Sequence, residues 1–165
     1  MTLKLGVVMD PIGSIAFHKD STLAMLLEAQ ARGWEIYYME QSDLFLRDGE
    51  TQARTRRLKV ALDPKNWFEF GTETTTPLAT LDAILMRKDP PFDMQYIYTT
   101  TLLERAEARG VLVVNKPQSL RDCNEKLFTA WFPNLTPPTL VTRAAARLRD
   151  FLAEHGDVIL KPLDA

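Results

Sequence analysis

The chain has 165 residues, of which 45% are hydrophobic and 25% are charged, the ordinary balance of a globular protein. The formal net charge of −2 excludes a general attraction to nucleic acid or to an anionic membrane. Cys123 is the only cysteine, which excludes an intramolecular disulfide and suits a reducing compartment. No run approaches the roughly 20 apolar residues of a membrane span, and the short apolar N-terminus does not resemble a secretory signal. We therefore expect a cytoplasmic protein with no nucleic-acid or membrane partner.

Residues 3–39 predict a βαβ unit. Residues 3–9 form a short continuous apolar run, which is typical of a buried parallel strand. Asp20 and Ser21 are good N-caps for a helix whose apolar residues recur at helical spacing until Gly33. Residues 34–39 predict a second strand, and the crossover between the two strands should be right-handed.

The next stretch interrupts the alternation of strands and helices. Residues 43–47 and 53–62 flank Asp48-Gly49, a strong hairpin turn signal, and predict two antiparallel strands. Residues 63–77 carry aromatic residues among turn residues and a threonine run. We expect an irregular segment there, packed by its aromatic side chains.

The remaining pattern completes a sheet and leads into a second unit. Strands over 81–86 and 111–114 and a helix over 94–108 predict an α/β fold, with an open, largely parallel sheet and flanking helices. After Pro117 the pattern predicts a helix, a strand, a helix and a strand, over residues 119–131, 139–142, 143–154 and 157–161 in that order.

Charged residues follow the first strand, at the edge where open α/β sheets bind ligands. Asp10-Pro11 ends this strand, and one interpretation is a ligand-facing carboxylate. The alternative is an ordinary turn in which the aspartate bonds its own backbone. Gly13 stands alone, and because the G-x-G-x-x-G spacing is missing, a dinucleotide site is not expected.

A second charged segment, residues 87–93, places two cations and two carboxylates around a Pro-Pro turn directly after a strand. Arg87 presents a planar fork that suits a substrate carboxylate, whereas Lys88 acts as a point charge. The alternative is a solvated loop whose charges pair with one another, with Asp93 as the N-cap of the next helix.

Two lysines are candidate ligands for a nucleotide phosphate. Lys161 follows residues 157–160, so a buried strand would deliver its ammonium group to the strand end. Burying an ammonium group is costly unless an anion meets it. Lys126 follows Asn124 and Glu125 on a predicted helix. The alternative for both lysines is a solvated side chain.

Other reactive side chains favour structural interpretations. Cys123 has no local histidine partner, so we expect a spectator thiol. His18 and His155 lack companion ligands at metal-binding spacing, so no zinc site is predicted. A basic stretch on the predicted hairpin is expected to be a solvated strand face, the alternative being a nucleic-acid surface: Arg54, Arg56, Arg57 and Lys59.

Four blocks of the sequence resemble the bacterial glutathione synthetases, a family of ATP-grasp ligases. They are KLGVVMDP at residues 4–11, ILMRKDPPFD at 84–93, VNKPQSLRDCNEK at 114–126 and ILKPLD at 159–164. The second and third blocks are long and specific to the family, whereas the Lys-Pro block is common to many ATP-grasp enzymes. The resemblance runs through the whole chain in order.

The resemblance implies an enzyme that joins γ-glutamylcysteine to glycine with ATP and Mg²⁺, through an acyl phosphate of the dipeptide. Such phosphoryl transfer needs cations around the triphosphate, which the candidate lysines could supply. It implies a Rossmann-like pre-ATP-grasp domain over residues 1–120 and the start of an ATP-grasp domain over 121–165. Lys126 and Lys161 match the two lysines that contact ATP, and Arg87 lies in the block that lines the active-site cleft on the substrate side.

The family continues from the Lys-Pro block into a glycine-rich loop, magnesium ligands and a lid, and Ala165 stands where a glycine is expected. We therefore expect no metal site in this chain, Mg²⁺ ligands beyond its end, and no activity of the chain alone. The family also implies a homo-oligomer. The alternative hypothesis is a stand-alone α/β binding or oligomerisation domain without turnover.

Overall fold

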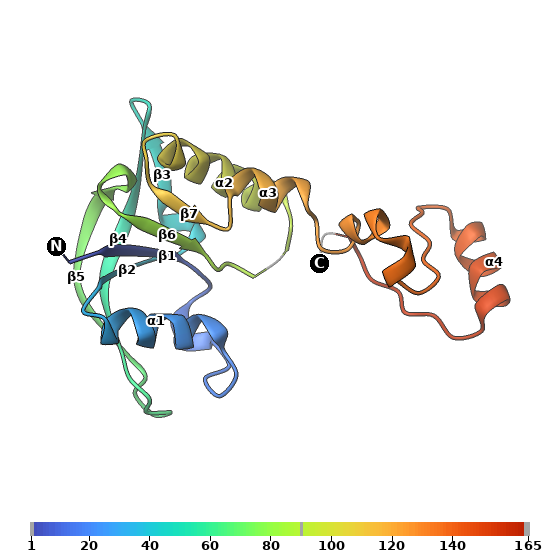
Figure 1. The fold of residues 1–165 in the computed structure, drawn as a ribbon, viewed down its shortest axis with the longest axis horizontal. Helices are drawn as coiled ribbons and strands as arrows, with labels where there is room; N and C mark the ends of the chain where they lie inside the picture. Colours follow the sequence, from blue (N-terminus) through green and yellow to red (C-terminus); the bar gives the residue numbers. More distant parts are fainter. Residues whose placement is uncertain (1, 90, 164–165) are drawn as a thin grey trace.

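A seven-stranded sheet organises the first part of the chain, in the order β3-β4-β2-β1-β6-β7 with β5 paired to β4 (Figure 1). The computed structural model describes residues 2–89 and 91–163. The strands are β1 (Lys4–Val8), β2 (Glu35–Met39), β3 (Leu44–Arg47), β4 (Glu50–Val60), β5 (Phe68–Pro77), β6 (Ala83–Met86) and β7 (Leu112–Val114). The α-helices are α1 (Ser21–Ala31), α2 (Met94–Glu107), α3 (Pro117–Asp122) and α4 (Ala145–His155).

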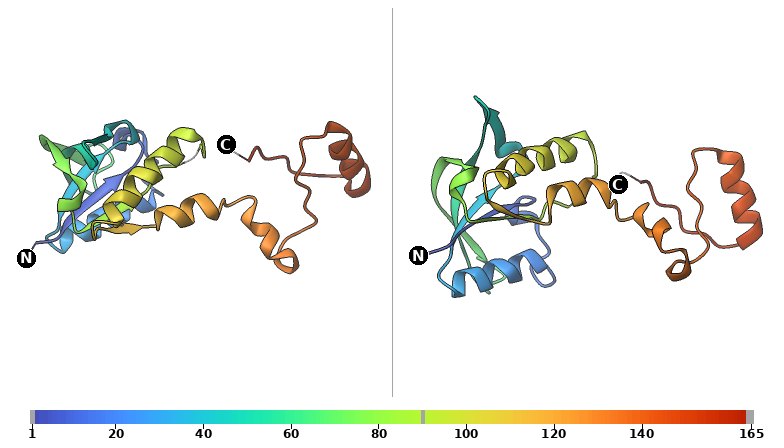
Figure 2. Two further views of the ribbon diagram at one scale, coloured as in Figure 1. Left: turned by 90° about the horizontal axis from the view of Figure 1, so that it is seen from above. Right: turned by 45° about the horizontal axis from the view of Figure 1, so that its top comes forward.

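The α/β class and the βαβ unit are confirmed. Strands β2, β1, β6 and β7 pair in parallel. The Asp20 carboxylate accepts the N–H of Leu23 at 2.7 Å and so caps α1. Gly33 follows α1 at a φ of +73°, a left-handed conformation that glycine adopts without strain. Helix α1 covers one face of the sheet, and α2 and α3 cover the other (Figure 2).

The other half of the sheet is antiparallel. Asp48 and Gly49, both at positive φ, form the predicted turn between β3 and β4. Strand β4 pairs with β3 and then with β2, and β5 pairs with β4 over most of its length. Parallel pairing therefore covers only the β2-β1-β6-β7 half of this open sheet.

Strand β5 corrects the expectation of an irregular segment over residues 63–77. Its threonines are β-branched and suit an extended backbone, which the turn residues around them obscure in the sequence. The hydroxyls of Thr55 in β4 and Thr76 in β5 lie 2.7 Å apart. The ring of Phe70 in β5 packs 5.0 Å from that of Tyr38. The aromatic packing was predicted correctly, but a strand provides it.

Two apolar clusters form the core, one on each face of the sheet. Leu26 of α1 packs against Val7 on one face, and Leu103 of α2 packs with Ile84 on the other. Gly6 lets neighbouring side chains approach β1, because a Cβ there would lie 2.8 Å from the Cδ1 atom of Leu81. Packing on both faces therefore fixes the positions of the central strands β1 and β6, whose carboxyl ends carry the charged residues.

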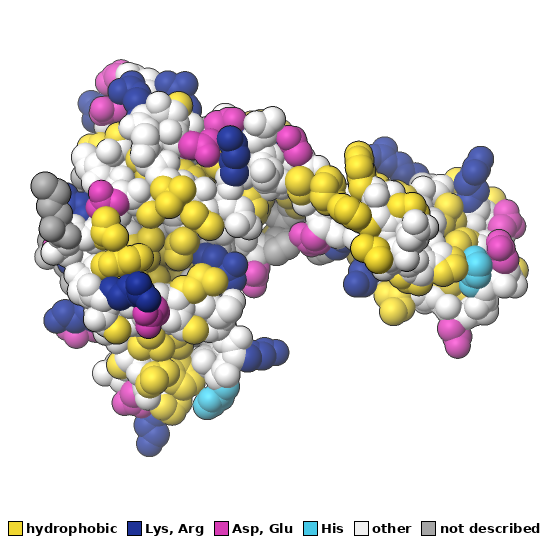
Figure 3. Space-filling model, viewed as in Figure 1, with side chains coloured by type: hydrophobic (Ala, Val, Ile, Leu, Met, Phe, Trp, Pro, Cys, Tyr) yellow, Lys and Arg dark blue, Asp and Glu magenta, His cyan; other side chains and the backbone are white. Residues whose placement is uncertain are grey.

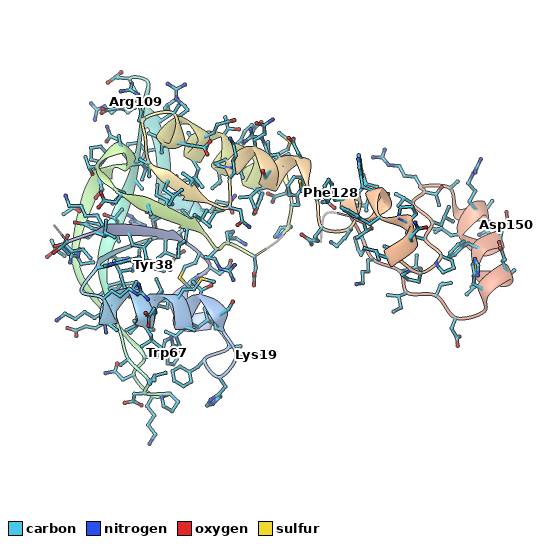
Figure 4. All side chains as sticks on the ribbon, in the orientation of Figure 1. Lys19, Tyr38, Trp67, Arg109, Phe128 and Asp150 are labelled. Carbon is cyan, nitrogen blue, oxygen red and sulfur yellow. The ribbon has the colours of Figure 1, made fainter. Side chains whose placement is uncertain are left out.

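Residues 124–163 form a second, extended unit that projects from the sheet domain (Figures 1 and 2). The predicted helix over 119–131 is instead α3 followed by a 3-10 turn at Phe128–Trp131, while the predicted C-terminal helix is confirmed as α4. The strands predicted over 139–142 and 157–161 are not formed. A strand needs a partner edge, and within residues 124–163 no side chain is buried. In Figure 4, Phe128 marks where the chain leaves the sheet domain and Asp150 lies on α4.

Candidate functional site

A pocket of about 330 Å³ opens at the carboxyl edge of β6 and β7. Open α/β sheets bind ligands at this edge. An ion pair of 2.7 Å between Arg121 and Glu104 holds α3 against α2 beside it. Residues that follow β6 and β7, together with α2, α3 and the turn after α3, form the walls: Met86, Arg87, Lys88, Asp89, Phe92, Tyr96, Asn115, Ser119, Leu120, Cys123, Asn124 and Glu125.

Asp10, at the end of β1, contacts the charged segment that follows β6. Val8 of β1 lies opposite Met86 of β6 in the parallel register, so Asp10 and Lys88 leave the sheet at the same level. The Lys88 Nζ atom lies 2.9 Å from the Asp10 Oδ1 atom. The N–H of Asp89 donates to the other carboxylate oxygen of Asp10 at 2.9 Å. Asp10 therefore braces the segment after β6, which the ordinary-turn interpretation of this residue did not include.

Arg87 lies in the pocket wall without a carboxylate partner among the described residues. Its Nε and Nη2 atoms donate to the hydroxyl groups of Thr22 and Ser21, each at 3.0 Å. Its own N–H donates to the carbonyl of Val8 at 2.7 Å and anchors the backbone to β1. Neutral hydroxyls orient the guanidinium group but leave its charge unbalanced, so it can bind a substrate carboxylate.

The alternative interpretation of residues 87–93 is confirmed only for the N-cap, because no ion pair joins two of the described charges of this segment. Lys88 is paired with Asp10, as described. Asp93 is the N-cap of α2, and its Oδ1 atom accepts the N–H of Tyr96 at 2.8 Å. Arg87 is thus the cation of this segment that remains available for a ligand.

Tyr96 is a wall residue that the sequence analysis missed. Its ring packs 5.3 Å from the ring of Phe92. Burial raises the pKa of Tyr96, and the nearby Glu125 carboxylate raises it further. The phenol stays protonated at neutral pH and can donate a hydrogen bond. The sequence could have indicated Tyr96 through its spacing, because a residue three positions after the Asp93 cap lies in the first turn of α2, beside the pocket.

The structure brings the segments of Lys126 and Lys161 together, but not through a strand. Lys126 directly follows two wall residues, and the Asn124 Oδ1 atom accepts its N–H at 3.0 Å. Its side chain is only 18% exposed. Lys161 is exposed on an extended segment that returns to the site, where the Asn124 side chain donates to the carbonyl of Leu163 at 3.4 Å. The expectation that a buried strand delivers Lys161 was wrong.

The remaining candidates have structural surroundings. Cys123 is exposed at the pocket, and the ring of His155 packs 4.3 Å from that of Phe151. Within the described ranges, no three His, Cys, Asp or Glu side chains are grouped so that they could hold a metal ion. No helix there is both long and apolar enough to cross a bilayer. The basic stretch is a strand face on which carboxylates pair with arginines: Arg54 with Asp43, Arg56 with Glu40 and Arg57 with Glu35.

The sheet with its pocket at the carboxyl edge has the fold of an ATP-grasp ligase. A solved structure titled "Structure of ATP-grasp ligase PsnB complexed with minimal precursor" is similar to it with a TM-score of 0.52, over 100% of this chain and 55% of that chain. At 20% identity this likeness shows a shared fold.

The sequence comparisons define the family. The model described as "Prokaryotic glutathione synthetase, N-terminal domain" matches residues 3–121, and the one for its ATP-grasp domain matches residues 125–165. Glutathione synthetases of Yersinia pestis and Pseudomonas putida are 67% and 63% identical over 98% and 99% of this chain. The chain belongs to the prokaryotic glutathione synthetase family. It spans about half the length of these relatives, 51% and 52%.

Proposed function

We propose that this chain supplies the N-terminal domain and the first part of the ATP-grasp domain of a glutathione synthetase, with a domain boundary near residue 120. The reaction is the ATP-dependent joining of γ-glutamylcysteine to glycine. The observation that carries the proposal is the Arg87 guanidinium, which is oriented by the hydroxyls of Ser21 and Thr22 at the start of α1 and has no carboxylate partner among the described residues. Arg87 is also one of the residues that line the pocket. A substrate with carboxylate groups supplies the missing charge.

Each candidate residue has a role in this proposal. Arg87 binds a carboxylate of the dipeptide in a forked geometry, and the Tyr96 phenol donates a hydrogen bond beside it. Lys126 and Lys161 offset the negative charge of the ATP phosphates, since charge stabilisation dominates catalysis of phosphoryl transfer. Mg²⁺ accompanies ATP in this proposal, but the described residues hold no ligand cluster that fits it.

We extend the proposal to the cellular setting. The single cysteine suits a reducing compartment, so we assign the protein to the cytoplasm. We also assign it a homo-oligomeric state, as the family resemblance implies. A second candidate function is a binding or oligomerisation domain without turnover, which is favoured by an uncovered apolar area that includes Leu112 and Val114 of β7.

A chimera tests the proposed ligase function. Residues 1–165 are joined to the part of the Yersinia pestis glutathione synthetase beyond the matched half. We expect the chimera to form glutathione from γ-glutamylcysteine, glycine and Mg-ATP. The chain alone should not, because its lysines lie in a unit without buried side chains and are poorly preorganised. A folded chimera without ATP-dependent peptide formation would contradict the ligase proposal and favour the binding domain.

A further inference from the structure

The loop that joins β1 to α1, residues 9–20, holds the segment after β6 from both of its ends. Near its start, the Asp10 carboxylate contacts Lys88 and the backbone N–H of the next residue. At its other end, the first two residues of α1 orient the Arg87 guanidinium with their hydroxyl groups. The position of Arg87 therefore depends on where this loop lies.

Both backbone polar groups of one loop residue, Ile12, are bound by ring side chains from elsewhere in the chain. The Ile12 N–H donates to the Tyr38 hydroxyl at 3.3 Å, and the Ile12 carbonyl accepts the Trp67 Nε1–H at 3.0 Å. The Ile12 side chain is buried in the core cluster that also contains Leu26 of α1. Because a buried backbone group needs a partner, these two hydrogen bonds fix the chain two residues after Asp10. We call this pair of hydrogen bonds the Ile12 clamp.

Trp67 reaches the loop from the connection between β4 and β5, below α1 in Figure 4. Its ring lies 5.9 Å from the ring of Phe17 on the loop and 5.6 Å from the ring of Phe68, the first residue of β5. Figure 3 shows hydrophobic side chains gathered below α1, where the end of the β4–β5 hairpin lies in Figure 1. The hairpin therefore meets the loop through ring packing and one directional hydrogen bond.

The connection that carries Trp67 is itself ordered. The N–H of Ala61 donates to the Trp67 carbonyl at 2.9 Å, and the N–H of Asn66 donates to the Asp63 carbonyl at 3.0 Å. A phenylalanine would satisfy much of the ring packing in this place, but it has no N–H to donate. The indole N–H is therefore the feature of Trp67 that holds the loop backbone in addition to filling space.

We propose that Trp67 is a positioning residue for the carboxylate-binding Arg87, and that it acts through the Ile12 clamp. The proposal rests on the role of Arg87 proposed above and extends its support to a hairpin outside the pocket wall. When the clamp is loosened, Asp10 and the start of α1 shift, and the guanidinium loses its orientation toward the substrate. Small displacements of a binding group weaken a forked contact strongly. The candidate nucleotide lysines lie in the separate unit 124–163, so ATP binding should not respond.

Steady-state kinetics of the chimera test the clamp. Trp67→Phe keeps an aromatic ring but removes the Nε1–H donor. We expect the KM for γ-glutamylcysteine to rise about 3- to 10-fold, the effect of weakening one hydrogen bond, while the KM for ATP stays unchanged. Trp34→Phe is the matched control, because Trp34 packs against the same core cluster and its indole donates no hydrogen bond within the described part of the chain.

A double-mutant cycle shows whether Trp67 acts through Arg87. In the Arg87→Ala background, Trp67→Phe should change the KM for γ-glutamylcysteine by less than about twofold, because the group that the clamp positions is gone. Tyr38→Phe removes the other hydrogen bond of the clamp and should show the same dependence on Arg87. This second variant also carries the test if urea unfolding shows that Trp67→Phe does not fold.

Other results would overturn the assignment. Effects of Trp67→Phe and Arg87→Ala that multiply in the double variant would leave Trp67 with a general structural role only. An equal rise in the KM for ATP would exclude a specific action on the dipeptide site. If Arg87→Ala raises the KM for the dipeptide and neither Trp67→Phe nor Tyr38→Phe does, the clamp has no role in substrate binding, but the carboxylate site stands. If Arg87→Ala itself has no effect, the proposed carboxylate site fails first.

Discussion

The carboxylate of Asp10 bridges the ammonium group of Lys88 and the backbone N–H of Asp89, each at 2.9 Å, although 79 positions separate Asp10 from Asp89. This contact ties the carboxyl ends of β1 and β6 together. It also fixes the backbone that immediately follows Arg87. The geometry of the proposed substrate-binding residue therefore depends on a residue from a different strand.

Asp10→Ala should loosen this edge of the sheet and misplace Arg87. The variant leaves the Asp89 N–H without its partner, and a lost hydrogen bond of this kind costs about 1–2 kcal/mol. Asp10→Asn should cost less, about 0–1 kcal/mol, because the amide oxygen can still accept that N–H while the partly exposed ion pair is lost. Urea unfolding of chain 1–165 measures both changes, with the exposed Asp157→Asn as the control. Equal stability of the Ala variant and the control would show that the bridge contributes nothing.

Arg87 should act on the peptide substrate and not on ATP. In the chimera, Arg87→Ala should raise the KM for γ-glutamylcysteine by about 10- to 100-fold, as expected for the loss of a charge-assisted hydrogen bond of about 1.5–3 kcal/mol. Arg87→Lys should recover only part of the loss, because lysine lacks the planar fork. Steady-state kinetics measure the effect, and Arg47→Ala at the exposed end of β3 is the matched control. A changed affinity for ATP with an unchanged KM for the dipeptide would contradict the assignment.

Lys126 and Lys161 should each contribute to nucleotide binding. In the chimera, Lys126→Ala and Lys161→Ala should weaken ATP binding, each by about 10-fold or more, since each removes a cation from a site for several phosphates. The predicted strand before Lys161 would have held this side chain more rigidly than a helix start holds Lys126, but that strand is not formed. Because Lys126 is more buried and its turn is fixed by Asn124, we now expect Lys126 to matter at least as much.

Calorimetric titration of ATP into these two lysine variants measures the effect, with the exposed Lys65→Ala as the control. If both variants bind ATP as well as the control does, and only their thermal stability falls, the lysines have a structural role and the nucleotide assignment fails.

Tyr38 should stabilise the sheet domain through its hydroxyl group. The phenol donates to the Glu40 Oε1 atom at 2.6 Å and accepts the N–H of Ile12 at 3.3 Å, in a buried setting. Tyr38→Phe leaves the Ile12 N–H unpaired and should cost about 1–3 kcal/mol of the free energy of unfolding. Tyr98→Phe, at an exposed position on α2, should cost much less.

The same residue gives a pH dependence. Burial, reinforced by the bond to Glu40, raises the pKa of Tyr38 above the ordinary tyrosine value. The protonated phenol therefore favours the folded state, and this contribution is complete below the unfolded pKa of about 10 and is lost as the pH rises through the folded pKa. Unfolding measured between neutral and alkaline pH should show a smaller alkaline loss in Tyr38→Phe. If the free energy of unfolding falls equally at alkaline pH with and without the substitution, Tyr38 is not the group whose ionisation causes the loss.

Much of the fold follows from local sequence signals. The apolar run of β1, the Asp20 cap of α1 and the Asp48-Gly49 turn each depend on residues close together in the chain. Backbone conformation and side-chain caps decide such features locally, so they could be predicted. The family could also be recognised, because its blocks are contiguous segments. Arg87 was a candidate because it directly follows a strand.

Only the tertiary structure decided which distant segments pair with one another. Asp10 meets Lys88 because β1 lies beside β6 with Val8 opposite Met86, and no local pattern specifies that register. Strand β5 forms because β4 offers it an edge, whereas residues 157–161 have strand-like composition but no partner edge among the described residues. A strand is stabilised by hydrogen bonds to another segment, so its own sequence cannot determine whether it forms. The sequence therefore determined the caps, turns and family, and the contacts between strands decided the geometry of the site.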